Sequence, residues 1–441
     1  MTSTSSFTEA IVAEFARFSE QALHANAAQT VKNAFVDTIA CVRGASQHLY
    51  DSQVAQAVLG DVSPQKTSPF RLLQPSVLPP TQQSAVMLYA TAAHYDDYDD
   101  FAFAAHPSCV LVPIIISECE RTEDYSRVVE AYAFGYQVWG MLSRHLPKPM
   151  HDLGWHQTCI IGSIAGAAAL VTQRGGTADT LRSALGFAST FSGGLLASFG
   201  TSAKPIQVGA AAERSVLSAN LAHVGLTAAS DGCDALLAAI YGKRVFAAEA
   251  PPVYIDDFPP RMKKYAACYA THRIIDALIE MNLIGRAAEI EKIEVEVSET
   301  ARKVAGVDAP ENAAQARFSI PFVAALAIQN GQVRQADFCP TTLADPNLLA
   351  LMRKVAISIT TQACPEEPAL AFMDRVKIQF SSGQIIDESV RFVRGHKSHP
   401  LRPDDLKNKI LDCVGVDGLE AVSREAERFL TQQDTAFATS A

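Results

Sequence analysis

The chain has 441 residues, of which 48% are hydrophobic and 19% are charged, and its formal net charge is −10. This length predicts more than one folded unit, and the composition is that of a globular protein rather than a disordered one. An acidic chain without clusters of Lys and Arg argues against nucleic-acid binding, because contacts to phosphates need concentrated positive charge.

Secreted, membrane-spanning and metal-cluster proteins are also disfavoured. The opening "MTSTSSFTEA" lacks the basic and then apolar pattern of a secretory signal. The most apolar stretch, "CIIGSIAGAAALV", is shorter than the roughly 20 residues that a membrane helix needs and predicts a buried, closely packed helix. Nine cysteines are scattered without a C-x-x-C pair, which fits neither a zinc site nor an iron–sulfur cluster. We therefore expect a cytoplasmic protein without nucleic-acid or membrane partners.

The first half of the chain has the periodicity of helices. Across residues 7–245, segments such as "FTEAIVAEFARF" and "SRVVEAYAFGYQVWGML" repeat apolar residues at 3.6-residue spacing. A stretch with four prolines in thirteen residues, "APPVYIDDFPPRM", follows and predicts a stiff linker.

Beyond the linker the pattern changes to a mixture of strands and helices. Alternating segments rich in Val and Ile predict strands within 292–299, 354–362 and 375–392, the last folded as a hairpin around a Ser-Gly turn, with helices at 270–283 and 318–330. We therefore predict a mainly α fold: a large all-α helical domain of residues 1–262, to which 395–441 return, and a smaller α+β lid domain of residues 263–394.

The stretch "HYDDYDDFAFAAHPS", residues 94–108, places four aspartates within five residues. A solvated acidic helix end is one interpretation. A second is a D-D-x-x-D grip for Mg²⁺ and diphosphate, in which Asp96 and Asp100 share one helical face, but the sequence shows no second acidic motif to complete it. The third is acid–base chemistry, because neighbouring carboxylates raise the pKa of at least one of them.

Histidines and lysines elsewhere favour the third interpretation. His106 precedes a proline, His156 precedes the Ala- and Gly-rich helix, and Lys204 stands in a loop punctuated by Gly and Pro. Three more such residues open the second part of the chain: Lys263, Lys264 and His272. Together with Asp97 they would form a cationic cleft that contains a base and suits an acidic substrate.

At these residues the sequence resembles the MmgE/PrpD family, which includes 2-methylcitrate dehydratase, cis-aconitate decarboxylase and iminodisuccinate epimerase. The aspartate stretch is similar to the family's H-x-x-D-[FY]-D-D segment followed by H-P-[SG]. The family's later blocks are similar, in the same order, to "GWHQTCIIGSIAGAAAL", "LRSALGFASTFSGGL", "FGTSAKPIQVGAAAERSVLSANLAHVGLT" and "KKYAACYATHRIIDAL". The resemblance covers almost the whole chain.

The resemblance implies an active site between the helical domain and the lid, no metal or organic cofactor, and a homodimer. It places the catalytic residues at Asp97, His106, His156, Lys204, Lys263 and His272. Asp97 would orient a histidine or, if its neighbours raise its pKa, carry a proton itself.

Several positions depart from the family pattern. Gln207 stands where many relatives have His, Cys268 where decarboxylase-like members have His, and Phe101 where Thr or Ser is common; the segment before His106 is also about one residue shorter. We expect Gln207, Cys268 and Lys264 to contact the substrate. The departures favour an epimerase or a dehydratase of a small di- or tricarboxylate over a cis-aconitate-type decarboxylase, and a catalytically inactive polycarboxylate-binding protein is an alternative of another class.

Overall fold

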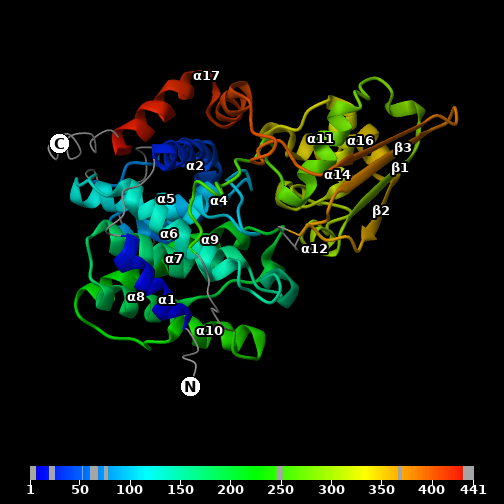
Figure 1. Cartoon of the computed structure of the whole chain (residues 1–441). Coiled ribbons are helices and arrows are strands. Elements are labelled where there is room, and N and C mark those ends of the chain that lie inside the picture. Colours follow the sequence, from blue (N-terminus) through cyan, green and yellow to red (C-terminus); the bar gives the residue numbers. More distant parts are fainter. Residues whose placement is uncertain are drawn as a thin grey trace.

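The computed structural model describes residues 6–18, 25–51, 53–59, 68–73, 78–245, 252–365 and 370–430. Within the described residues up to 245, the long regular elements are all helices (Figure 1), as the periodicity predicts. They are α1 (Phe7–Phe18), α2 (Ala25–Asp51), α3 (Val54–Leu59), α4 (Gln82–His94), α5 (Ser108–Thr122), α6 (Val128–Ser143), α7 (Gln157–Gln173), α8 (Ala178–Phe191), α9 (Ala203–His223) and α10 (Gly232–Tyr241).

Small residues allow the helices of this body to pack closely. Helix α7 is buried at every position, as expected for its run of Ala and Gly. Gly209 in α9 faces α4 so closely that the hydroxyl of Thr91 and the carbonyl oxygen of Met87 occupy the space that a Cβ would take. The C-terminal end of α4, at His94, therefore lies beside the N-terminal end of α9, which carries Lys204.

The second part of the chain builds a small mixed sheet with the order β2-β1-β3-β4. Its strands are β1 (Ile290–Ser298), β2 (Val355–Thr360), β3 (Asp374–Phe380) and β4 (Ile385–Val390). Strand β1 pairs in parallel with β2 and antiparallel with β3, which forms the predicted hairpin with β4. Helices α11 (His272–Glu280) and α14 (Ile320–Asn330) share an apolar cluster with the buried residues of β1 and β3.

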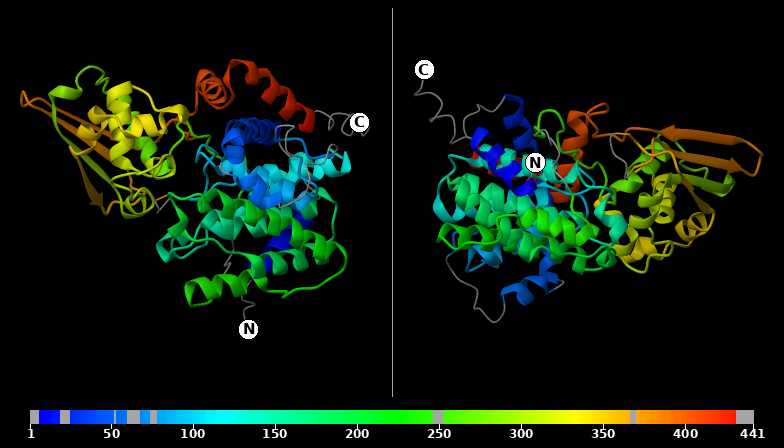
Figure 2. Two further views of the ribbon diagram at one scale, coloured as in Figure 1. Left: turned by 180° about the vertical axis from the view of Figure 1, so that it is seen from behind. Right: turned by 60° about the horizontal axis from the view of Figure 1, so that its bottom comes forward.

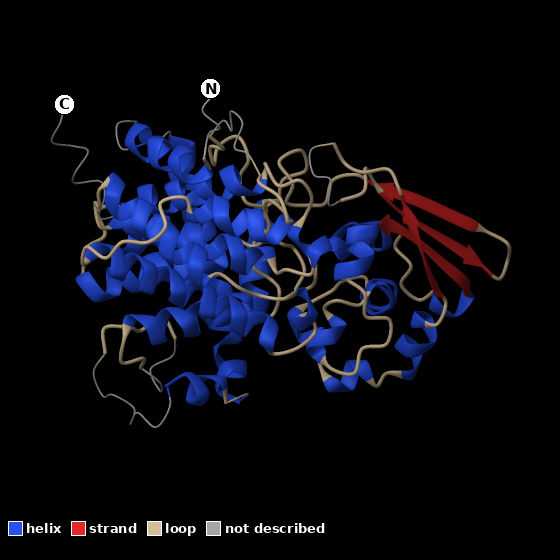
Figure 3. Ribbon diagram, turned by 90° about the horizontal axis from the view of Figure 1, so that it is seen from below, coloured by secondary structure: helices blue, strands red, loops and turns tan. Residues whose placement is uncertain are grey.

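Shorter helices complete this part, which lies to one side of the helical body (Figures 2 and 3). They are α12 (Glu299–Val304), α13 (Ala313–Ala316), α15 (Pro340–Leu343) and α16 (Pro346–Met352). The predicted linker contains no helix or regular strand over 252–262, and its residues 250–251 lie outside the described residues. A single backbone bridge between Phe101 and Arg261 ties the linker to the aspartate stretch.

The last helix, α17 (Pro403–Leu430), returns to the helical body and lies along α2 (Figure 1). Ile410, Val422 and Phe429 join the body's apolar core. Its ammonium group at Lys409 forms a buried ion pair with Asp37 of α2, with Nζ 2.5 Å from a carboxylate oxygen. The mainly α fold class is thus confirmed, whereas the predicted domain limits and the lid role of the smaller part stay predictions. Among the described helices, none is long and apolar enough to cross a bilayer.

Candidate active site

The four aspartates after α4 are buried, with exposed fractions of 5% or less. The interpretation as a solvated helix end is therefore wrong. The helical face expected for a D-D-x-x-D grip is also absent here, because α4 ends at His94 and Asp97 has a positive φ of 51°. Asp96 pairs with Arg317 at 2.6 Å, whereas Asp100 accepts a hydrogen bond from the hydroxyl of Ser108. Asp96 and Asp100, which the grip would place on one face, thus contact different partners.

Asp97 binds two lysine ammonium groups that come from different parts of the chain. One carboxylate oxygen lies 2.7 Å from Nζ of Lys204, and the other lies 3.0 Å from Nζ of Lys263. Lys263 also donates to the backbone carbonyl of Asp97 at 2.6 Å. Burial alone raises the pKa of a carboxyl group, but the two ammonium groups outweigh it and hold the pKa of Asp97 far below its usual range. Asp97 is therefore a permanent carboxylate, and the hypothesis that its neighbours raise its pKa is wrong.

The raised pKa belongs to Asp100 instead. Burial raises it to about 7, and the nearby charges of Asp37 and Asp99 add to the effect. The prediction that at least one of the crowded carboxyl groups would be hard to ionise thus holds, but for a residue that faces Ser108 rather than the lysines.

His94, which begins the aspartate stretch but was not among the predicted site residues, connects the carboxylates to Lys204. Its Nδ1 lies 2.9 Å from Asp99, an acceptor, so this nitrogen carries the hydrogen. Its Nε2 is then the acceptor for the ammonium of Lys204, 2.5 Å away. Burial and the charge of Lys204 lower the pKa of His94 to about 4, against the opposing effect of Asp99. His94 is therefore neutral at neutral pH.

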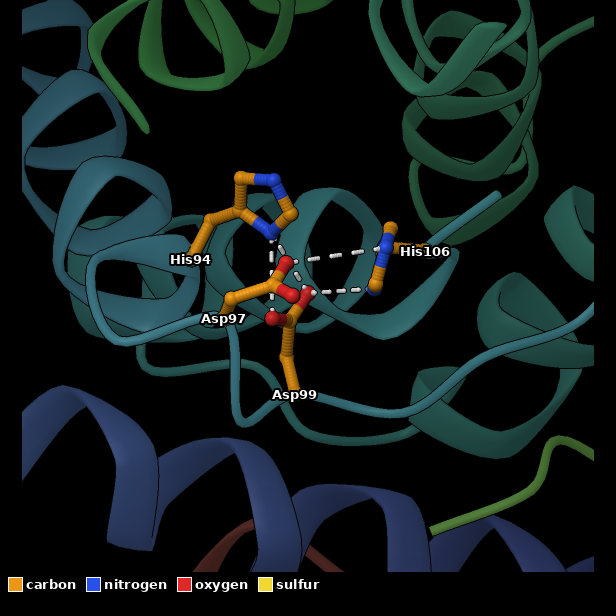
Figure 4. Close-up of side chains that lie close together, drawn as sticks. All are labelled: His94, Asp97, Asp99 and His106. Carbon is orange, nitrogen blue, oxygen red and sulfur yellow. Dashed lines mark hydrogen bonds and ion pairs between the residues drawn. The ribbon is translucent and has the colours of Figure 1, made fainter. Parts of the chain in front are cut away.

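His106 faces the same cluster from the other side (Figure 4). Its Nδ1 lies 2.9 Å from the carbonyl oxygen of Asp100, which can only accept, and 3.3 Å from Asp99. The hydrogen is therefore on Nδ1. The lone pair of Nε2 remains, in the neutral ring, directed to the side on which Asp97 lies 3.9 Å away. This geometry is that of a general base held in one tautomer by its backbone.

A third histidine, His156, presents a donor. The backbone N–H of Leu195 donates to Oε1 of Gln207, which turns the amide nitrogen of Gln207 to Nδ1 of His156 at 2.7 Å. Because that amide nitrogen donates, Nδ1 accepts and the hydrogen of a neutral His156 is on Nε2. Burial and Lys204 lower the pKa of His156, so the ring is neutral. Nε2 is buried and has no hydrogen-bond partner among the described residues.

These groups border one small cavity between the helical body and the second part. Of the predicted residues, the structure brings Asp97, His106, His156, Lys204 and Cys268 to its wall. Phe101, Tyr269 and Phe318 supply apolar walls. The volume is about 50 Å³, on a scale on which one water needs about 10–15 Å³.

The other predicted site residues lie outside this wall. Lys263 is buried beneath Asp97, and Gln207 acts on His156 from behind. Lys264 is half-buried with its ammonium 5.2 Å from the ring centre of Tyr265, and His272 is enclosed with Nε2 3.2 Å from the carbonyl oxygen of Ala267. Burial lowers the pKa of His272 to about 3.

Local structure explains how two of these side chains are placed and why one residue was missed. Lys204 is in the first turn of α9, not in a loop, because Pro205 is tolerated where helical N–H groups have no partner. His156 is the N-cap of α7, as its place before the small-residue helix predicts. His151, which also lines the cavity, was missed because it sits in a short 3-10 turn, Met150–Leu153, without periodicity.

The ligand atoms of His94, Asp97, Asp99 and His106 lie within 4.8 Å of one another, and these groups are of the types that bind metal ions. Lys204 nevertheless contacts Asp97 and His94 together, and Lys263 contacts Asp97. The lysine ammonium groups therefore already provide the positive charge that this cluster needs.

The fold and the site together define a class: a mainly helical enzyme with ionisable groups gathered at a cavity between two folded parts. Comparison with known proteins identifies the family within this class. The family models described as the MmgE/PrpD N-terminal domain and the MmgE/PrpD C-terminal domain match residues 11–242 and 265–432. The chain belongs to the MmgE/PrpD family.

Curated relatives of this chain include the cis-aconitate decarboxylases of Homo sapiens, Mus musculus and Aspergillus terreus, each 25% identical to it. The human alignment covers 83% of this chain and 77% of the relative. The mouse alignment covers 75% and 71%, and that of Aspergillus terreus 77% and 75%.

Proposed function

We propose that this enzyme moves a proton at a carbon next to a carboxylate of a small di- or tricarboxylate, as an epimerase or a dehydratase. The observation that carries this proposal is the cluster around Lys204. A buried ammonium faces the cavity next to a histidine whose free nitrogen is an acceptor and a second histidine whose free nitrogen is a donor.

Substrate binding uses the donors that the protein leaves open. An ammonium group has three N–H bonds, and Lys204 directs two of them to His94 and Asp97. The third, together with Nε2–H of His156, is available to a substrate carboxylate. Both donors are fixed before the substrate arrives, so little reorganisation is needed when negative charge develops there.

Proton transfer falls to His106. Its Nε2 takes the proton from the carbon, and the electrons move into the adjacent carboxylate, where Lys204 stabilises the resulting enediolate. Asp97 orients the ammonium group of Lys204. Epimerisation takes place when a proton from water reaches the opposite face of the enediolate while His106 keeps the first. Dehydration takes place when the proton on His106 is transferred to the β-hydroxyl, which leaves as water.

The second candidate is decarboxylation of a tricarboxylate such as cis-aconitate, which the named activity of the relatives favours. The same groups would serve this reaction, but bond cleavage would come first and proton transfer second. The carboxylate leaves as CO₂, and protonated His106 then delivers a proton to the carbon. Cys268 at the cavity wall, whose pKa is raised by burial to about 11, remains a neutral thiol in either case.

The deciding experiment incubates the enzyme in D₂O with 2-methylcitrate, cis-aconitate and iminodisuccinate and follows each by ¹H NMR. Deuterium at the carbon next to a carboxylate, with epimer or alkene formation, is the expected result, and release of CO₂ identifies the second candidate. Binding without any exchange would instead identify a binding protein. Pre-treatment with EDTA should leave the rate unchanged; loss of the rate, restored by a divalent ion, would contradict lysine-based charge stabilisation.

A further inference from the structure

A second, larger cleft lies beside the candidate active site, and four residues border both: Phe101, Ala104, Tyr269 and Leu370. Phe101 and Tyr269 stack with ring centres 4.0 Å apart and planes 12° apart. With Leu370 they border the inner cavity on one side and the outer cleft on the other. The outer cleft has two lobes of about 520 and 170 Å³, joined through Arg144, Phe258 and Leu370.

The outer cleft carries strong positive charge in a chain that is acidic overall. The cationic side chains that line it are Arg144, Lys148, Arg261, Arg273, Arg391 and Lys397. The described residues that line it include no Asp or Glu. The charge of Arg273 is partly neutralised by Asp374, 3.5 Å away. Among the cations that line the cleft, Arg144, Lys148 and Lys397 are exposed to solvent.

We propose that this outer cleft is a binding site for carboxylate anions, from which a substrate polycarboxylate enters the inner cavity past Phe101, Tyr269 and Leu370. This proposal deepens the proposed function and rests on it for the identity of the natural ligand. The inner cavity has room for only a few water molecules, so a polycarboxylate reaches it only when the partition moves. A cleft that holds the anion outside until then raises its local concentration.

The partition is built from both folded parts, which couples entry to their relative movement. Phe101 belongs to the aspartate stretch, whereas Tyr269 and Leu370 come from the second part. Arg261 links the two: its backbone pairs with Phe101, and its guanidinium lies 3.4 Å from the hydroxyl of Tyr269. An anion drawn to the cations of the outer cleft therefore arrives next to the aromatic pair that must open.

The test compares R144Q/K397Q with the wild type and with R353Q, a control that removes an exposed guanidinium just after α16, at a residue that lines neither the inner cavity nor the outer cleft. We measure kcat/KM and kcat for the active polycarboxylate between 20 and 200 mM NaCl. The double variant is expected to lose about 3–10-fold in kcat/KM at low salt, with kcat within twofold and a flatter salt dependence, because steering by charge is screened by salt. Equal values and equal slopes in the double variant and R353Q would overturn the proposal.

Binding measured without turnover separates this proposal from the proposed function. Isothermal titration uses tricarballylate, a tricarboxylate without a hydroxyl or a double bond, and sulfate as an inorganic anion. Weaker tricarballylate binding to R144Q/K397Q than to R353Q supports the outer site even if no substrate of the panel turns over. Absence of tricarballylate binding to the wild type, or sulfate binding as tightly as tricarballylate, contradicts a carboxylate site.

Discussion

Two buried lysine–aspartate pairs stand close together in this protein and differ in one respect. Lys204 and Asp97 meet at 2.7 Å on the wall of a cavity, whereas Lys409 and Asp37 meet at 2.5 Å between α2 and α17. Lys409 also donates to the carbonyl oxygen of Tyr98 at 2.7 Å, and its ammonium lies over the ring of Tyr98.

The difference shows that burial of a charge pair does not by itself indicate a catalytic role. Both pairs cost desolvation energy and both are held by further contacts. Only Lys204 has a side open to a cavity, so only it has a donor left for a ligand. The Lys204–Asp97 pair is therefore suited to binding and catalysis. The Lys409–Asp37 pair is suited to holding α17 against the helical body.

The largest expected effect separates the two pairs by activity. K204M keeps most of the side-chain volume and removes the charge. We expect kcat to fall by about 10²–10³-fold, since the group that stabilises the developing charge is lost, as for the removal of an oxyanion-hole donor. Melting should change less than in K409M, because Asp97 retains Lys263. A K204M enzyme with more than a tenth of the wild-type kcat would remove Lys204 from the mechanism.

The matched variant K409M tests the other pair by stability. Removing one partner of a buried pair leaves an uncompensated charge, which costs about 3–5 kcal/mol of unfolding free energy. Chemical denaturation should therefore show a marked loss, while kcat per folded molecule stays within threefold. The double variant D37N/K409M should recover part of the stability. Loss of turnover in the folded fraction would mean that this pair also serves the site.

A third variant tests whether His106 is the group at the cavity that takes the proton from the substrate. H106Q is expected to lower kcat about 10²-fold, within the usual contribution of a general base. The pH–rate profile is the control, because the limb that reports the ionisation of the base should disappear in the variant. An unchanged profile with a lower rate would make His106 a binding residue rather than the base.

The smallest effect concerns Asp100, whose pKa is raised to about 7. The unfolded carboxyl titrates near about 3.9, so the folded protein binds more protons between about pH 4 and 7, and this group's contribution to stability falls as pH rises through that window. Asn does not titrate. The Tm of D100N relative to wild type should therefore increase by a few degrees from pH 5 to pH 8, measured by calorimetry. A difference that does not depend on pH would contradict the raised pKa.

Much of the fold could be predicted because each element carries its own local pattern. The helical spacing before residue 245 and the alternation at 292–299 and 375–392 recur in the structure as helices and strands. Residue types also indicated which segments meet at the cavity, since Asp97, His106, His156, Lys204 and Cys268 all line it or contact it.

The pairing within the site could not be predicted from sequence. Asp97, Phe103 and Ala104 adopt positive φ values. Such values are uncommon for residues other than glycine, so the residue types did not predict them. These turns decide which aspartate faces the lysines and which faces Ser108. His94 begins the H-x-x-D-[FY]-D-D segment, but its role was missed because it depends on the distance between the ends of α4 and α9.

That distance is set by a residue without a side chain. Gly209 lets α9 lie against Thr91 and Met87 of α4, which lie in the last two turns before His94. A methyl group there would push the helices apart and separate Lys204 from His94, although nothing at position 209 can bind, donate or accept through a side chain. Gly209 has no functional group, yet the substitution G209A should lower turnover, as a substitution of Lys204 does. In this protein, the contact between α4 and α9 at Gly209 is thus as necessary to the site as the groups that react.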